Sequence, residues 1–175
     1  MKKSVVFILL VIIVTGFAFA ENLQFNVHWV INNIKTTTMQ VLPYNGSGVL
    51  PQDAEDNYLK TLYPSVNTAP YNVCLIKYTT NVKGTHKLEF SATPMESELT
   101  SEEHPYSLYI TYGNGFPVIL NVDPEELDNS KAITFSVIGS GETTANIYLD
   151  AVLTDLDEMQ IGDYSSTVTI SRISE

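Results

Sequence analysis

The sequence has few of the residues on which covalent and metal-based chemistry depends. Its 175 residues include one cysteine, three histidines and one tryptophan. The lone Cys74 excludes a disulfide between two cysteines of this sequence, and its apolar neighbours predict a buried thiol that acts as a small hydrophobic side chain. A bridge to another chain is the alternative for such a cysteine.

Basic residues are also scarce. Nine lysines and arginines stand against 20 aspartates and glutamates, which gives a formal net charge of −11. This balance argues against nucleic acid and against anionic membrane surfaces as partners, because both bind through positive charge on the protein. It is compatible with cationic partners, with divalent metal, or with a solvated acidic surface that binds neither.

The sequence contains no motif of a known catalytic or metal centre. His28, His86 and His104 lie in separate segments without the spacing of a zinc site. There is no Gly-x-Ser-x-Gly elbow and no phosphate-binding loop. We therefore expect a protein that is not an enzyme, without catalytic residues, metal ligands or cofactors.

Acidic residues gather in three segments, at 96–103, 123–128 and 155–163. Residues 155–159 begin like a calcium-binding loop but lack the third ligand and the glycine at its position. A pair of these carboxylates could also serve glycoside hydrolysis, although the distance between two carboxylates cannot be read from a sequence. The interpretation favoured here is that these segments are solvated acidic loops.

Only one long apolar run is present, and it lies at the N-terminus. Lys2 and Lys3 precede the apolar stretch 5–14, and Ala18-Phe19-Ala20 follows, which is the pattern of a secretory signal peptide cleaved after Ala20. The apolar run 5–20 has 16 residues, short of the ~20 that a membrane-spanning helix needs. We therefore expect residues 1–20 to be a signal peptide and residues 21–175 to be one exported domain without a membrane span. It would be located in the periplasm, at the cell surface or outside the cell.

Alternation of apolar and polar residues dominates the rest of the chain. A period of two places successive side chains on opposite faces and is typical of a half-buried β-strand. Strands are predicted at residues 23–31, 36–42, 72–79, 86–93, 106–112, 116–122, 132–138, 143–153 and 164–173. About seven to nine short strands separated by turn signals predict an all-β antiparallel sandwich. Residues 53–62 predict a short helix, and residues 81–84 a hairpin turn.

Aromatic residues offer a second interpretation. The sequence has ten tyrosines and seven phenylalanines, and aromatic faces stack on sugars. Tyr44, Tyr58, Tyr63 and Tyr71 lie in or beside the least regular part of the chain, where ligand contacts often occur. Most aromatic residues within strands are nevertheless expected in the core or in cross-strand pairs.

The C-terminal run Gly162-Asp163-Tyr164-Ser165-Ser166-Thr167-Val168-Thr169-Ile170 resembles the closing strand of bacterial pilin-type subunits and of spore coat protein U-like domains. Gly162 is also 14 residues from the end when Glu175 is counted as the first, where pilin-type subunits often have a glycine. The chain departs from those families in having Ser174 where many pilins have tyrosine, and in lacking their paired cysteines. The resemblance is confined to this last part of the chain.

The resemblance implies an immunoglobulin-like sandwich that is completed by a strand from a neighbouring subunit. An extended segment would then fill an open sheet edge. Residues 23–31 could be such a donor strand or the domain's own first strand, and we favour the second. The residues that strand exchange or assembly would involve are Leu23, Phe25, Val27, Trp29, Ile31, Gly162 and Tyr164.

Together these observations predict an exported structural or adhesive protein of the cell surface, with protein partners or self-assembly through strand addition. The alternative is a secreted carbohydrate-binding β-sandwich module that binds glycans, and an acid-using hydrolase comes third.

Overall fold

The computed structural model describes residues 22–30, 37–44, 57–62, 70–138, 141–153, 159 and 162–173. These residues form twelve strands, and none of them is helical. The strands are β1 (Asn22–Val30), β2 (Thr37–Leu42), β3 (Asn57–Leu62), β4 (Pro70–Thr80), β5 (Gly84–Ala92), β6 (Met95–Ser97), β7 (Glu103–His104), β8 (Tyr106–Tyr112), β9 (Val118–Val122), β10 (Ser130–Val137), β11 (Thr143–Leu153) and β12 (Asp163–Ile173).

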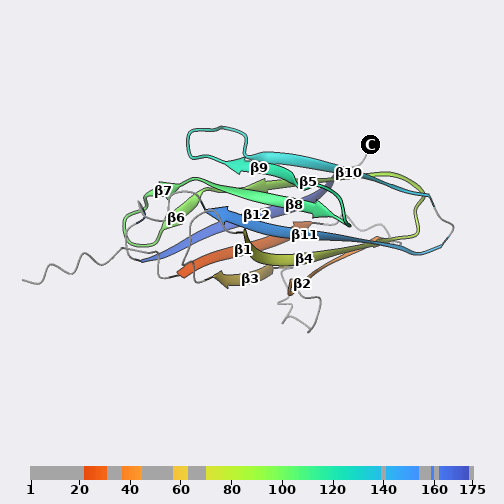
Figure 1. Ribbon diagram of the computed structural model, residues 1–175, viewed down its shortest axis with the longest axis horizontal. Helices are drawn as coiled ribbons and strands as arrows, with labels where there is room; N and C mark the ends of the chain where they lie inside the picture. The colour runs from red at the N-terminus through yellow and green to blue at the C-terminus, as the bar shows by residue number, and fades with distance from the viewer. Residues whose placement is uncertain are drawn as a thin grey trace, which may run out of the picture.

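The strands form two sheets. Sheet A has the order β10-β5-β12-β1-β3, with β6 also paired to β12 and β7 paired to β6. Sheet B has the order β2-β4-β11-β8-β9. In Figure 1 the long strands run along the length of the molecule, with β9 and β10 along one side and β2 and β3 along the other. The all-β class and the two antiparallel sheets expected from the alternation are confirmed.

The core lies between the two sheets and is built from alternate residues of their strands. In β8 and β12, for example, every second side chain is buried, which is the consequence of the period of two. The fully buried aliphatic and aromatic residues come from both sheets, and each stabilises the fold by about 1.5–3 kcal/mol relative to an exposed position. They include Phe25, Val27, Leu88, Phe90, Val168 and Ile170 from sheet A, and Ile76, Tyr78, Leu108, Ile147 and Leu149 from sheet B.

All nine predicted strands are present, and three more occur. Two of the additional strands, β6 and β7, are short and lie in the acidic segment that was interpreted as a loop. The third, β3, lies where a helix was expected. That expectation is wrong for residues 57–62, and residues 53–56 lie outside the described part of the chain. Pairing with β1, with Leu23 opposite Leu62 and His28 opposite Asn57, overrides the weak local preference for a helix.

The predicted hairpin at residues 81–84 is also wrong. Residues 81–83 connect β4 in sheet B to β5 in sheet A, so the chain crosses between the sheets at this point. The Val82 amide donates to Thr80 Oγ1 at 3.1 Å, and the His86 ring is 2.9 Å from the Val82 carbonyl through Nε2. These contacts turn the chain without pairing the two flanking strands.

Residues 1–20, which we expect to be a signal peptide, lie outside the described part of the chain. Within the described ranges, no helix has the length and apolar character needed to cross a membrane.

Candidate strand-exchange site

The first described strand, β1, occupies an interior position in sheet A between β12 and β3. It runs parallel to β12, with Phe25 opposite Ser166 and Val27 opposite Val168. It runs antiparallel to β3. Every other strand pairing among the described residues is antiparallel, so the seam between the first and the last strand differs from the rest of the fold.

One face of β1 forms part of the core. Phe25 and Val27 are both 0% exposed, whereas Gln24, Asn26 and His28 on the opposite face are partly exposed. The alternation predicted for this segment is confirmed over these residues. Because the side chains of Phe25 and Val27 are completely buried, β1 forms part of the core and contributes to the stability of the domain.

The remaining predicted positions of this segment are placed by their backbone alone. Leu23 lies opposite Tyr164, and Trp29 lies opposite Ile170 in the parallel register. Ile31 lies outside the described residues. In this single chain the segment pairs with strands of its own chain.

A buried polar contact lies beside Phe25 of β1. Ser166 Oγ donates to the Thr93 carbonyl at 2.7 Å, and the Tyr106 hydroxyl is 2.6 Å from Ser166 Oγ. Because the serine proton is already used, Tyr106 is the donor in the second bond. Burial raises the pKa of Tyr106, which keeps this hydroxyl protonated. The Phe25 ring packs edge-on against Tyr106, with centroids 5.5 Å apart.

Gly162 and Tyr164 have structural positions at the start of β12. Gly162 is buried, and a Cβ atom there would lie 3.1 Å from Leu99 Cδ1. Tyr164 is fully buried, lies opposite Ser97 of β6, and has the His104 ring edge-on at 5.5 Å. They lie close to β1 in the sheet, since Leu23 is opposite Tyr164.

Both edges of β12 are occupied by the domain's own strands. β1 lies along one edge, and β6 and β5 lie along the other. A strand from another molecule could therefore pair with β12 only by taking the place of one of these strands. Among them, β1 is the one that comes first along the chain.

The described residues do not bring the titratable side chains together into a metal site. Within these ranges there is no cluster of three or more histidine, cysteine, aspartate or glutamate side chains that could hold a metal ion. His86 is bonded through Nδ1 to the Tyr78 hydroxyl at 2.9 Å, and His104 lies 3.9 Å from a Glu102 oxygen. Most of the segment considered for calcium, residues 154–158, lies outside the described part of the chain. Cys74 is completely buried, as predicted.

A second group of polar and aromatic side chains lies on the outer face of sheet B. The Tyr44 hydroxyl donates to Asp150 Oδ2 at 3.0 Å, and the Tyr44 ring packs against Tyr148 with centroids 5.3 Å apart. Tyr109 lies opposite Asp150 in the neighbouring strand. Desolvation raises the pKa of Asp150, whose Oδ1 atom is buried and has no hydrogen-bond partner among the described residues. Burial, followed by the bond to Asp150, raises the pKa of Tyr44 to about 12.

Of the four tyrosines considered for sugar binding, only Tyr44 belongs to this outer group. Tyr71 packs partly buried against the core. Tyr58 is described by its backbone alone, and Tyr63 lies outside the described residues.

No pattern in the sequence indicates the Tyr106–Ser166 bond or the Tyr44–Asp150 bond. The partners are separated by 60 and 106 positions, and neither pair follows a local spacing. Their burial could be predicted from the alternation, but their pairing depends on which strands become neighbours.

The chain matches no protein-family model, and no curated protein matches it.

Proposed function

We propose that the protein is an exported structural or adhesive subunit of a cell surface, an immunoglobulin-like sandwich that assembles by strand addition. In the assembled form, β1 of one copy takes the place between β12 and β3 of the next. The observation that carries this proposal is the position of β1, which is the first described strand, an interior strand and the parallel partner of the last strand.

Departure of β1 would leave a groove that only a similar strand fills well. The backbone groups of β12 and β3 that pair with β1 would lose their partners, and the core would lose Phe25 and Val27. Unpaired backbone groups and empty apolar sites both cost free energy. The β1 strand of another copy restores each of these contacts, which is why exchange of an identical element is an inexpensive route to oligomers.

The expected processing of the chain favours such exchange. Cleavage after Ala20 would leave β1 beside a free N-terminus, so that the strand could leave and enter the groove without threading the rest of the chain. The C-terminal resemblance to pilin-type subunits concerns β12, the strand that would receive the donor.

A disulfide between β1 and β12 tests the proposal. Asn26 and Thr167 are opposite each other in the register and both are partly exposed, so the double variant Asn26→Cys, Thr167→Cys can form a bond across the seam. Two pools of this variant with different affinity tags are mixed over a range of concentrations and then oxidised. We expect disulfides between the two tags in the oligomer fractions, increasing with concentration.

The matched control carries Thr111→Cys and Tyr148→Cys, which are opposite each other in β8 and β11. These strands do not exchange, so its disulfides should stay within one chain. If the β1–β12 variant also forms only intrachain bonds while the protein remains monomeric at every concentration, strand exchange is ruled out.

The outer face of sheet B favours a second candidate, a carbohydrate-binding module. Tyr44, Tyr109 and Tyr148 are partly exposed there around Asp150, and tyrosine rings beside a carboxylate acceptor can bind sugar rings and hydroxyl groups. Titration with a glycan panel should then quench tyrosine fluorescence in the wild type but not in Tyr148→Ala. A flat titration across the panel counts against this candidate.

A further inference from the structure

The strands β9 and β10 are edge strands of the two sheets and lie on the same side of the molecule (Figure 1). An edge strand presents backbone N–H and C=O groups that another chain can pair with, and proteins usually protect it with charges, proline or a bulge. The β9 sequence, VILNV, contains neither a charge nor a proline. Pro117 stands directly before the strand. The register of β9 with β8 continues without a shift, so β9 itself contains none of these three protective features.

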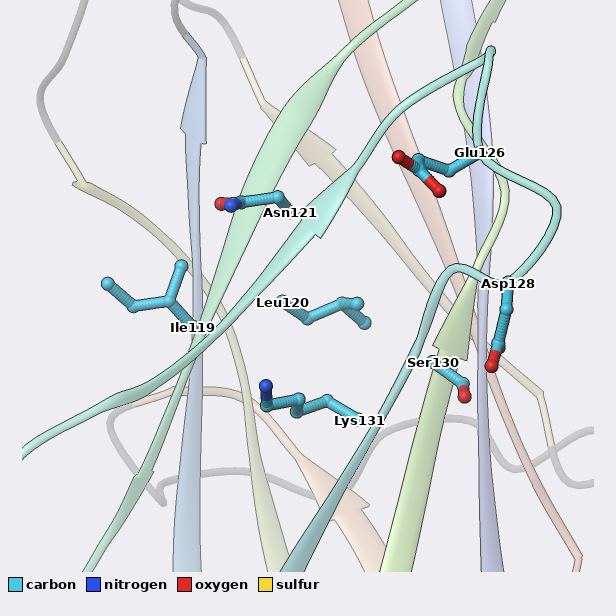
Figure 2. Close-up of a pocket in the computed structure, with 7 residues that line it drawn as sticks. All are labelled: Ile119, Leu120, Asn121, Glu126, Asp128, Ser130 and Lys131. Atoms are coloured by element: carbon cyan, nitrogen blue, oxygen red, sulfur yellow. The ribbon is translucent and has the colours of Figure 1, made fainter.

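A pocket of about 260 Å³ lies between the two edges (Figure 2). Its lining combines Ile119, Leu120 and Asn121 of β9, Glu126 and Asp128 of the connecting turn, and Ser130 and Lys131 of β10. Glu126 lies on the turn at one end of the pocket, and Lys131 extends from β10 toward β9 at the other end (Figure 2). Among the described residues, Glu126, Asp128 and Lys131 form no ion pair.

The turn that carries the two carboxylates is held in place by its own hydrogen bonds. The Asn129 side chain accepts from the Asp123 amide and donates to the Asp123 carbonyl, both at 3.0 Å. The Glu125 amide donates to Asp123 Oδ1 at 2.9 Å. The carboxylates therefore project from a fixed support and not from a freely moving loop.

Large apolar side chains border the same edge. Ile119 is 43% exposed on β9 itself, and Leu127 on the turn is fully exposed. Phe116, two residues before the start of β9, is 96% exposed. Single exposed apolar residues are ordinary, but several beside an unprotected strand edge are typical of a protein-binding surface.

The charges at this edge decide what kind of segment fits it. Residues 123–128 carry four carboxylates, against the one ammonium group of Lys131, and the whole chain has a net charge of −11. A second copy of the chain would bring the same acidic turn toward this one and be repelled. A basic segment would instead be attracted, and it would gain the most at the Glu126 end of the pocket.

We propose that the β9 edge binds an extended peptide segment of a partner protein, with a lysine or arginine side chain in the pocket beside Glu126 and Asp128. The backbone of the segment pairs with β9, and its alternate apolar side chains lie against Ile119. In this mode of recognition, main-chain hydrogen bonds provide affinity and pockets for alternate side chains provide specificity. Lys131 disfavours a second basic residue at the opposite end of the pocket. This repulsion fixes the register of the peptide along β9. The proposal concerns the β9 edge of sheet B and not the interior strand β1 of sheet A, so it does not depend on strand exchange.

Blocked, dye-labelled nonapeptides of alternating threonine and valine test this binding. One carries lysine in place of the central threonine, and a second carries glutamate there. A third has the lysine sequence with its internal backbone amides N-methylated, which keeps the charge and removes the donors for pairing. By fluorescence anisotropy with the full chain, we expect the lysine peptide to bind about tenfold more tightly than the glutamate peptide and the N-methylated peptide not to bind.

Two variants with the same change in net charge locate the contact. The Glu126→Gln, Asp128→Asn variant should lose the preference for lysine. The Glu98→Gln, Glu103→Gln variant, altered around β6 and β7, should keep it. Hydrogen exchange of the wild type with the lysine peptide should slow at the β9 amides.

Equal binding of the N-methylated peptide would show nonspecific attraction to an acidic protein and would overturn the proposal. So would absence of binding, loss of the preference in both variants, or protection at another edge. Dimerisation through β9 without any peptide would mean that a second copy occupies the edge, which also contradicts it.

Discussion

The Tyr106 hydroxyl donates a 2.6 Å hydrogen bond to Ser166 Oγ and thereby joins sheet B to sheet A inside the core. Ser166 Oγ in turn donates a hydrogen bond to the Thr93 carbonyl at 2.7 Å. The Tyr106 and Ser166 side chains are almost completely buried, so water cannot replace the bond between them without entering the core. This contact lies next to Phe25, and the seam between β1 and β12 is therefore supported by a polar contact as well as by apolar packing.

The first prediction concerns this contact. We expect Ser166→Ala to lower the free energy of unfolding by about 2 kcal/mol, because it leaves the Tyr106 hydroxyl buried without a partner and removes the bond to the Thr93 carbonyl. Tyr106→Phe leaves the bond to Thr93 intact and should cost about 1–1.5 kcal/mol. The double variant should be less destabilised than the sum of the two single variants, as measured by urea unfolding. Additive effects would contradict a coupled bond, and Tyr109→Phe on the outer face serves as a nearly neutral control.

The second prediction concerns alkaline pH. Burial raises the pKa values of Tyr106 and Tyr78, and burial with the bond to Asp150 raises that of Tyr44 to about 12. The folded protein thus holds these protons more tightly than the unfolded chain does. Their contribution to stability is complete below about pH 10, the ordinary pKa of tyrosine, and is lost as the pH rises toward the folded-state values.

Urea unfolding between pH 8 and pH 11.5 checks this expectation. Each such tyrosine should contribute a loss of up to about 1.4 kcal/mol per pH unit above pH 10. Tyr106→Phe should show a shallower loss than the wild type in that range. Identical slopes would mean that the Tyr106 hydroxyl titrates normally and is not buried.

The sequence predicted where the strands lie better than it predicted which strands pair with one another. The period of two locates β8 correctly because this strand buries one face. It could not predict which sheet β4 and β5 belong to, because a turn of three residues can join strands of one sheet or of two. It also misassigned β3, whose conformation depends on pairing with β1, a contact distant in sequence.

The candidate site, too, could be predicted from the sequence only where local alternation determines it. Phe25 and Val27 were identified by alternation, which depends on local sequence alone. The parallel pairing of β1 with β12 and the enclosure of β12 on both sides are properties of the topology, and a single sequence carries no local signal for them. The pocket between β9 and β10 likewise depends on two edges that become neighbours only in the fold.

The third prediction concerns the Cys74 thiol. Burial raises its pKa, and the negative charge of Asp150 adds to the effect, so the reactive thiolate is suppressed. We expect the native protein to react with a thiol reagent only as fast as it unfolds, with the rate increasing with urea. An exposed Ser165→Cys variant should react at once with one equivalent. Rapid labelling of Cys74 in the native wild type would be inconsistent with its burial.

The fourth prediction tests whether the backbone conformation or the close approach of Leu99 requires glycine at position 162. The residue has φ of 157°, and a Cβ atom would lie 3.1 Å from Leu99 Cδ1. Leu99 is 77% exposed, so its side chain can move away. We therefore expect Gly162→Ala to cost about 1 kcal/mol, mainly through the backbone conformation. Adding Leu99→Ala should not restore the stability of Gly162→Ala, and full recovery would show that the contact and not the backbone is responsible.

The last prediction concerns Phe25 and links stability to assembly. Phe25→Ala should lower the free energy of unfolding by about 3–5 kcal/mol, because it leaves a cavity beside Tyr106 in the core. If β1 is exchanged between copies, the same contacts are lost in the monomer and in the oligomer. Oligomers of the variant should therefore unfold at a lower urea concentration than wild-type oligomers, while the balance between folded monomer and oligomer changes little. Asn26→Ala, on the partly exposed face of β1, should leave both properties nearly unchanged. Light scattering after size-exclusion chromatography measures assembly, and hydrogen exchange of the β12 amides measures whether β1 remains docked. If only the monomer loses stability and the oligomers resist urea as well as wild-type oligomers do, Phe25 is excluded from the intermolecular contact.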